Sequence, residues 1–73
     1  MNFEQVDMLE VQLFAAGRRF TALLKIESSS RVHVREICLE SGEVFPTHHV
    51  PYSSVEEAKN AARGTVEDWA NGT

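Results

Sequence analysis

Residues 8–26 read MLEVQLFAAGRRFTALLKI, and this stretch decides the fold. Hydrophobic and polar side chains alternate on both sides of Gly17, with the period of two that is typical of a half-buried strand. Residues 15–18 supply a short turn in which Gly17 can adopt a positive φ. The stretch therefore predicts a β-hairpin with strands at about 8–14 and 19–27. The residues on its predicted core face are Leu9, Val11, Leu13, Phe20, Ala22, Leu24 and Ile26.

A third strand is predicted at about 31–40, after a second turn at 28–30. Its hydrophobic residues change face midway, between the pair before Arg35 and the pair after Glu36. A β-bulge near Arg35 and Glu36 would return both pairs to the core. The alternative is that both faces of the sheet are partly covered, for example by a second copy of the chain. The four hydrophobic residues are Val32, Val34, Ile37 and Leu39.

A C-terminal helix is predicted at about 54–70. Ser53 and Ser54 begin two overlapping Ser-x-x-Glu capping boxes. After them, small and apolar residues recur at steps of three or four and form one stripe for packing against the sheet. Gly64 costs up to ~1 kcal/mol inside a helix, and we expect it to permit a close approach to the sheet. The stripe consists of Val55, Ala58, Ala62, Val66 and Trp69, with the tryptophan expected to close one end of the core.

These elements predict an α+β fold: a three- or four-stranded antiparallel sheet with one C-terminal helix packed on one face, βββα or ββββα. A short fourth strand at 43–45 would be ended by Pro46, and 47–52 would form an irregular crossover to the helix. We expect a single small domain over 1–73, with residues 1–7 frayed. Because one helix covers one face only, the other face is the candidate functional surface.

The composition is that of an ordinary globular domain. The 73-residue chain carries a net charge of −4, with 42% hydrophobic and 25% charged residues. No apolar run approaches the roughly 20 residues that a membrane span needs. Cys38 is the single cysteine and cannot form an internal disulfide, which fits a reducing compartment. We therefore expect a soluble cytoplasmic protein.

Residues that could carry out chemistry do not form a recognisable pattern. His48 and His49 are adjacent, so on an extended segment they point in opposite directions, and neither shares a metal-site spacing with His33 or Cys38. The four glycines are isolated, so the sequence contains no glycine-rich phosphate-binding motif. A chain of this size also has little room for a pocket of about 300–1,000 Å³. We predict no catalytic residue, cofactor or metal, and hence no enzyme.

Basic residues concentrate in one part of the chain. Residues 17–35 hold five Lys and Arg against the single acid Glu27, a local net charge of +4, whereas the remainder carries −8. On an exposed sheet face such a segment could bind nucleic acid, or it could be a solvated face with cross-strand ion pairs to Glu10 and Glu27. The acidic whole favours the second interpretation, because nucleic-acid-binding domains are usually basic. The candidate interaction face comprises Arg18, Arg19, Lys25, Arg31, His33 and Arg35.

The order of three strands and then a helix opened by PYSSVEEAKNAA, residues 51–62, resembles several small βββα modules. Plant-type AP2 domains and the arm-binding domains of phage integrases have a similar layout, and they use the exposed sheet face on DNA. HicB-like antitoxin domains also have a sheet followed by a helix rich in Glu-Glu-Ala. The resemblance covers roughly residues 8–70 in the order of elements only, and it assigns no functional residue.

The sequence therefore predicts a non-enzymatic interaction module that binds a protein partner or a second copy of itself through the exposed sheet face and strand edges. A homodimer is expected because Met8, Phe14 and Leu23 fall on the outer face, and exposed apolar side chains tend to be buried against a partner. The alternative prediction is a βββα nucleic-acid-binding module that uses residues 18–35. No membrane partner is predicted.

Overall fold

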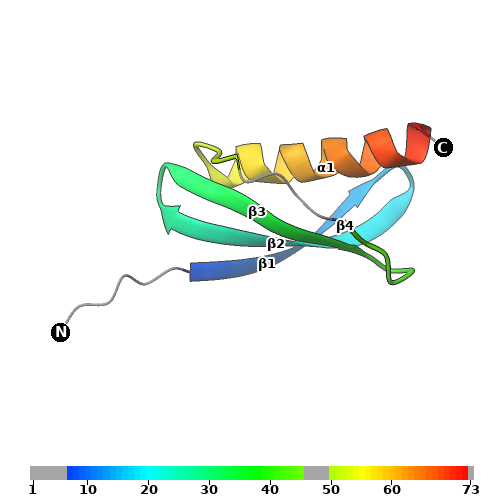
Figure 1. The fold of residues 1–73 in the computed structure, drawn as a ribbon, viewed down its shortest axis with the longest axis horizontal. Helices are drawn as coiled ribbons and strands as arrows, with labels where there is room; N and C mark the ends of the chain where they lie inside the picture. The colour runs from blue at the N-terminus through cyan, green and yellow to red at the C-terminus, as the bar shows by residue number, and fades with distance from the viewer. Residues whose placement is uncertain (1–6, 46–49, 73) are drawn as a thin grey trace.

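The fold is one antiparallel sheet with a helix lying across it (Figure 1). A computed structural model describes residues 7–45 and 50–72. The strands follow one another in the order β1-β2-β3-β4, and α1 covers one face of the sheet. The elements are β1 (Asp7–Ala15), β2 (Arg18–Ser28), β3 (Arg31–Leu39), β4 (Val44–Phe45) and α1 (Val55–Asn71). The predicted ββββα fold is confirmed.

Some sequence expectations concern residues outside this description. They are the fraying of residues 1–6, the end of the fourth strand at Pro46, and any role of His48 and His49. Asp7, expected to fray with the residues before it, is instead the first residue of β1.

The β1–β2 hairpin has a two-residue turn. Ala16 and Gly17 both have left-handed backbone angles, with φ of 55° and 73°, and Ala15 pairs with Arg18 across the turn. Positive φ at both central residues is characteristic of a type I′ turn, whose twist matches that of the flanking strands. The sequence predicts positive φ at Gly17 alone; Ala16 adopts it too because a two-residue turn of this type requires it at both positions.

The change of face in β3 is a β-bulge. Leu23 pairs with Glu36, and the next residue, Leu24, pairs with Val34, so Arg35 is the extra residue. The bulge turns the hydrophobic side chains before and after it toward α1, as in the first of the two interpretations that the sequence left open. The buried residues of β3 are Val32, Val34, Ile37 and Leu39.

Helix α1 begins at a capping box and packs small side chains on the sheet. The Glu57 N–H donates a hydrogen bond of 3.1 Å to the Ser54 hydroxyl, and the Ser53 N–H donates one of 3.1 Å to the Glu57 carboxylate. The predicted stripe is confirmed: Ala58, Ala62 and Val66 are buried, and Val55 and Trp69 pack partly buried against the core. Within the described residues, no helix is long and apolar enough to cross a membrane.

The close approach expected at Gly64 is wrong. A methyl group at this position would meet no atom within 4 Å. Gly64 lies two residues after Ala62, about 200° further round the helix, so it is not on the stripe that faces the sheet. Open space at Gly64 means that the glycine is not required for helix–sheet packing.

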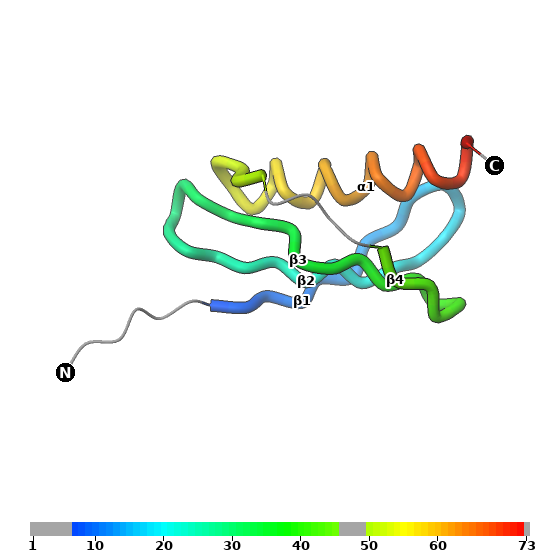
Figure 2. The backbone as a smooth tube through the Cα atoms, viewed as in Figure 1, coloured from blue at the N-terminus to red at the C-terminus, as the bar shows by residue number. Residues whose placement is uncertain are grey.

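The two edges of the sheet differ. The far edge of β3 pairs with β4, and at its start Val32 and Tyr52 exchange backbone hydrogen bonds of 2.8 and 2.7 Å. The segment that precedes α1 thus runs beside the start of β3 (Figure 2). β1 pairs with β2 on one side, and none of the residues in 7–45 or 50–72 pairs with its other side. In the part of the chain described, β1 is therefore the long free edge, while the opposite edge strand, β4, has two residues.

Candidate interaction surface

The outer face of the sheet is the face turned away from α1. It carries every second residue of β1 and β2, alternating with the buried residues that pack on the helix. The bulge brings alternate residues of β3 onto the same face. Three cross-strand rows result: Gln12–Thr21–Cys38, Glu10–Leu23–Glu36 and Met8–Lys25–His33. The middle of the outer face is therefore acidic and apolar, and Lys25 and His33 lie toward one end of it.

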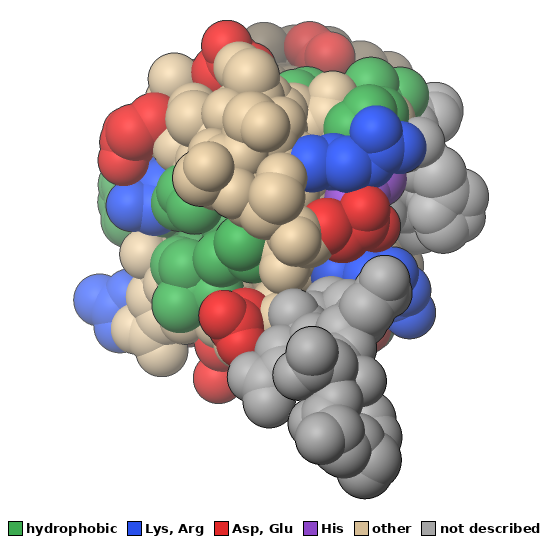
Figure 3. Space-filling view, turned by 90° about the vertical axis from the view of Figure 1, so that its left-hand side faces the viewer, with side chains coloured by type: hydrophobic (Ala, Val, Ile, Leu, Met, Phe, Trp, Pro, Cys, Tyr) green, Lys and Arg blue, Asp and Glu red, His purple; other side chains and the backbone are tan. Residues whose placement is uncertain are grey.

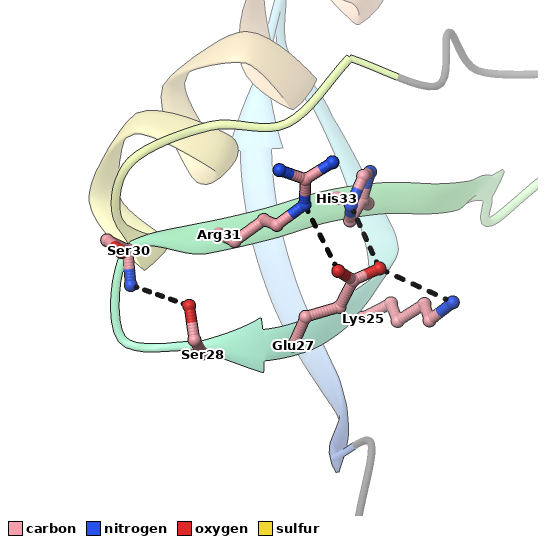
Figure 4. A network of polar contacts seen from close by, with 6 residues as sticks. All are labelled: Lys25, Glu27, Ser28, Ser30, Arg31 and His33. Carbon is pink, nitrogen blue, oxygen red and sulfur yellow. Dashed lines mark hydrogen bonds and ion pairs between the residues drawn. The ribbon is translucent and has the colours of Figure 1, made fainter. Parts of the chain in front are cut away.

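At that end a single carboxylate contacts three of the predicted basic residues (Figure 4). Glu27 Oε1 lies 3.1 Å from Arg31 Nε, and Glu27 Oε2 lies 3.2 Å from His33 Nε2 and 3.6 Å from Lys25 Nζ. Glu27 is the extra residue at a second register shift, near the end of β2, which re-aims its side chain. The cross-strand contacts to Glu27 suggested by the sequence are thus present, from Arg31 and His33 of β3, whereas no ion pair to Glu10 occurs among the described residues.

His33 is enclosed by this cluster. Its side chain is 12% exposed, and its Nε2 is a buried atom without an aligned hydrogen-bond partner, although Glu27 Oε2 is 3.2 Å away. A buried polar atom of this kind is costly unless it is paired, so the contact with Glu27 helps to satisfy His33 Nε2. His33 therefore belongs to the interior of the cluster and presents little surface to a ligand.

The other three predicted basic residues lie elsewhere. Arg19 contacts Glu40 at 3.7 Å, with both side chains largely exposed. The guanidinium of Arg18 lies over the ring of Trp69, on the helix side of the sheet. Arg35 is exposed at the bulge. The six residues of the candidate face are therefore divided between the two sides and the two ends of the sheet, and they do not form one basic surface.

Acidic and basic side chains are also intermixed at the end of the molecule that carries the β2–β3 turn (Figure 3). In the middle of the outer face, Glu10 and Glu36 flank Leu23 and line a hollow of 240 Å³ together with Thr21 and Cys38. This volume is below the range of about 300–1,000 Å³ that is usual for small-molecule sites. A nucleic-acid backbone lying on the outer face would thus meet carboxylates as well as cations.

Among the described residues, the free edge of β1 offers backbone groups without a partner strand. In a type I′ hairpin the residues flanking the turn, Ala15 and Arg18, form a hydrogen-bonded pair. Hydrogen-bonded pairs then alternate along the antiparallel ladder, so the odd-numbered residues of β1 direct their N–H and C=O groups to β2. The even-numbered residues direct theirs away from the sheet. These outward residues are Met8, Glu10, Gln12 and Phe14.

Exposed apolar side chains accompany this edge. Met8, Leu9 and Phe14 are 49%, 36% and 62% exposed. Phe14 also lines a shallow, open groove of 720 Å³ beside the first hairpin, together with Arg19 and Leu39. Natural edge strands commonly avoid pairing by means of proline, lysine or a bulge, and β1 has none of these along its nine residues. The edge is therefore open to another strand.

Chemically reactive groups are sparse. In the residues described, no group of three His, Cys, Asp or Glu is placed to hold a metal ion. Cys38 is free and half-buried, and its Sγ lies 3.8 Å from the carbonyl oxygen of Leu39. The sequence suggested ion pairs to Glu27, the one acid in segment 17–35, but it did not show that three side chains converge on this carboxylate.

No family model, no curated protein and no solved structure matches this chain. The resemblance to small βββα modules accordingly stays at the level of element order.

Proposed function

We propose that this protein is a non-enzymatic interaction module, which binds a protein partner or a second copy of itself through the free edge of β1 and the adjoining outer face. The observation that carries the proposal is the nine-residue β1 strand. It directs outward backbone groups that have no partner strand among the described residues, and three exposed apolar side chains lie beside them. Strand addition to such an edge is a recurring mode of recognition: the main chain supplies hydrogen bonds and alternate side chains supply specificity. We also propose that the protein is cytoplasmic, because its single cysteine, Cys38, is free and free thiols persist in a reducing compartment.

The arrangement of charge favours a protein over a nucleic acid as the partner. Lys25 and Arg31 share the carboxylate of Glu27, and Arg19 contacts Glu40, so these cations already face carboxylates. Glu10 and Glu36 face the solvent in the centre of the sheet. Nucleic-acid binding depends on Lys and Arg side chains that neutralise phosphates and release their counterions. Carboxylates on the same surface repel the phosphates and weaken that binding.

Photo-crosslinking at the edge tests the proposal. A photoreactive residue at Gln12, whose side chain and backbone groups are exposed at the edge, is expected to form adducts with protein in cells that express the chain. The matched control is the same photoreactive residue at Glu67, which is exposed on α1. Glu10→Pro removes one outward N–H without touching the β1–β2 ladder and should abolish the adducts. Equal yields at both positions, or adducts resistant to Glu10→Pro, would contradict the proposal.

A nucleic-acid titration tests the alternative. Random duplex and single-stranded DNA are added to isotope-labelled protein at ~50 mM salt, where non-specific electrostatic binding is strong. We expect no shift of the backbone amide signals. Shifts that concentrate on residues 18–35 and disappear with added salt would establish nucleic-acid binding in place of the proposed function.

A further inference from the structure

We propose that the strand received by the β1 edge is β1 of a second copy, antiparallel and in the register that places Met8 opposite Phe14 of the partner subunit. This inference rests on the proposed use of the β1 edge, and it adds the occupant and the alignment. It follows from the hydrogen-bonding pattern of β1, from the length of the strand and from its sequence.

Hydrogen-bond parity limits the possible registers. In a two-fold symmetric antiparallel pair, outward-directed residues of one strand must lie opposite outward-directed residues of the other. The outward residues of β1 are the even-numbered ones, so only even residues can pair with even ones. A slip by one residue would place outward groups opposite groups already bonded to β2, and it would also exchange the faces of the sheet. Registers therefore differ from one another by two residues.

Strand length selects one of them. β1 runs over Asp7–Ala15, and its central residue is Val11. A two-fold axis through Val11 pairs Asp7 with Ala15 of the partner subunit and uses the whole strand. It forms four outward pairs and hence about eight hydrogen bonds between the copies. Moving the axis by one residue in either direction leaves an end of each strand without a partner strand.

Side-chain chemistry selects the same register. With the axis at Val11, Met8 lies opposite Phe14 of the partner subunit at each end of the outer face. Between them, Glu10 lies opposite Gln12 of the partner subunit, whose amide can donate to the carboxylate. An axis at Glu10 would instead place two glutamates directly opposite each other, and an axis at Gln12 would place Glu10 against Phe14. Like charges directly opposite are destabilising, whereas apolar cross-strand pairs stabilise.

The helix side of the edge is complementary in the same way. Leu9, which is 36% exposed, lies opposite Leu13 of the partner subunit. Val11, half-buried in this chain, meets Val11 of the partner subunit at the axis. Because the axis is perpendicular to the sheet, both helices lie on one side, and the two four-stranded sheets join into one continuous sheet. All three exposed apolar residues of β1 thereby become covered.

Sedimentation of paired variants tests the edge. Gln12→Pro removes an outward N–H, and Gln12→Ala removes the side chain while keeping that N–H. We expect the wild type to dimerise with a micromolar dissociation constant, Gln12→Ala to stay within about threefold of it, and Gln12→Pro to weaken it at least tenfold. Far-ultraviolet circular dichroism confirms that each variant is folded. A folded wild type that remains an 8.2 kDa species at ~1 mM would overturn the inference.

A charge swap tests the register. Met8→Lys and Phe14→Glu should each weaken dimerisation at least tenfold, because each places a charge opposite an apolar side chain. Together they place Lys opposite Glu at both ends of the pair, so the double variant should recover most of the loss. Failure to recover would reject this register even if the protein is dimeric, since no other register brings positions 8 and 14 together.

A symmetric disulfide gives a second, independent measurement. In the Cys38→Ser background, Val11→Cys places two thiols at a non-hydrogen-bonded pair about 4.5 Å apart between Cα atoms, within disulfide range. Glu10→Cys is the matched control, because its two copies are diagonal neighbours about 7–8 Å apart. We expect rapid oxidation to a covalent dimer for Val11→Cys only. Equal rates would overturn the register.

Failure of this inference is distinguishable from failure of the proposed function. A monomeric wild type that still forms edge-dependent adducts with other proteins at Gln12 refutes the second copy as occupant and leaves the interaction module in place. A monomer without such adducts refutes both.

Discussion

The guanidinium carbon of Arg18 lies 5.1 Å from the ring centroid of Trp69. The first hairpin is thereby joined to the last turns of α1, two parts of the chain that are distant in sequence. The same tryptophan ring lies 5.4 Å from that of Phe45 in β4, at an interplanar angle of 47°. One half-buried residue thus connects β2, β4 and the helix at the end of the core.

Trp69→Ala should lower the free energy of unfolding by ~2 kcal/mol, less than the 3–5 kcal/mol typical of a fully buried tryptophan, because the side chain is half-buried. Trp69→Phe keeps a ring against Phe45 and should lose less than half as much. Urea denaturation measures both. Unchanged unfolding free energy in Trp69→Ala would mean that the ring does not pack on Phe45 and Arg18.

Ala16→Asn should raise the free energy of unfolding by ~1 kcal/mol. Ala16 has a φ of 55°, a left-handed conformation that costs an ordinary L-residue about 1–2 kcal/mol and costs asparagine less. Asn-Gly is moreover the preferred pair in type I′ turns. The opposite control is Ala16→Val, which should destabilise because a β-branched residue tolerates positive φ poorly. Thermal melts that rank the variants in the reverse order would argue against the type I′ turn.

Gly64→Ala should stabilise the protein by ~1 kcal/mol, since alanine has the higher helix propensity and its methyl group meets no atom within 4 Å. Ala62→Gly is the converse substitution at a buried position of the same helix and should destabilise. Chemical denaturation of the two variants supplies the comparison. A loss of stability in Gly64→Ala would show that the helix lies closer to a neighbour there than described.

Glu57 should make stability depend on pH in the acid range. Hydrogen bonds from the Ser53 hydroxyl, and next from the Ser53 backbone N–H, lower the pKa of Glu57 below its ordinary value of 4.5. Since the folded state has the lower pKa, the contribution is present above pH 4.5 and is lost as the pH falls through the folded-state pKa. The stability difference between wild type and Glu57→Gln should therefore shrink below pH 4.5. Glu56→Gln, which removes an acid from the same turn without this hydrogen bond, is the control.

Local pattern was enough to predict the elements and their faces. The alternation on either side of Gly17 predicted the first two strands, and the Ser-x-x-Glu pattern with the apolar steps predicted the helix; the observed elements begin and end within one residue of those expectations. The sequence also marked the place of the bulge at Arg35, but it left open the alternative that both faces of the sheet are covered, and the cross-strand register decided for the bulge. These features depend on near neighbours along the chain.

The candidate surface depended on pairings that span the chain. The sequence grouped six basic residues as one face, but Arg18 packs over Trp69 and Arg19 contacts Glu40, since cross-strand register and helix placement decide which side chains meet. A second register shift aims Glu27 at three of the others, and no sequence pattern marks that shift.

The free edge was likewise decided by tertiary structure. Sequence alone determined that three long strands and a helix would form a sheet with one uncovered face, because side-chain periodicity is a local property. Which long strand stays open depended on where the chain returns after β3. β4 and Tyr52 both pair with β3, which leaves β1 as the open long strand among the described residues. Backbone hydrogen-bonding groups are the same in every residue except proline, so their long-range pairing carries little signature in the sequence and is settled only when the chain packs.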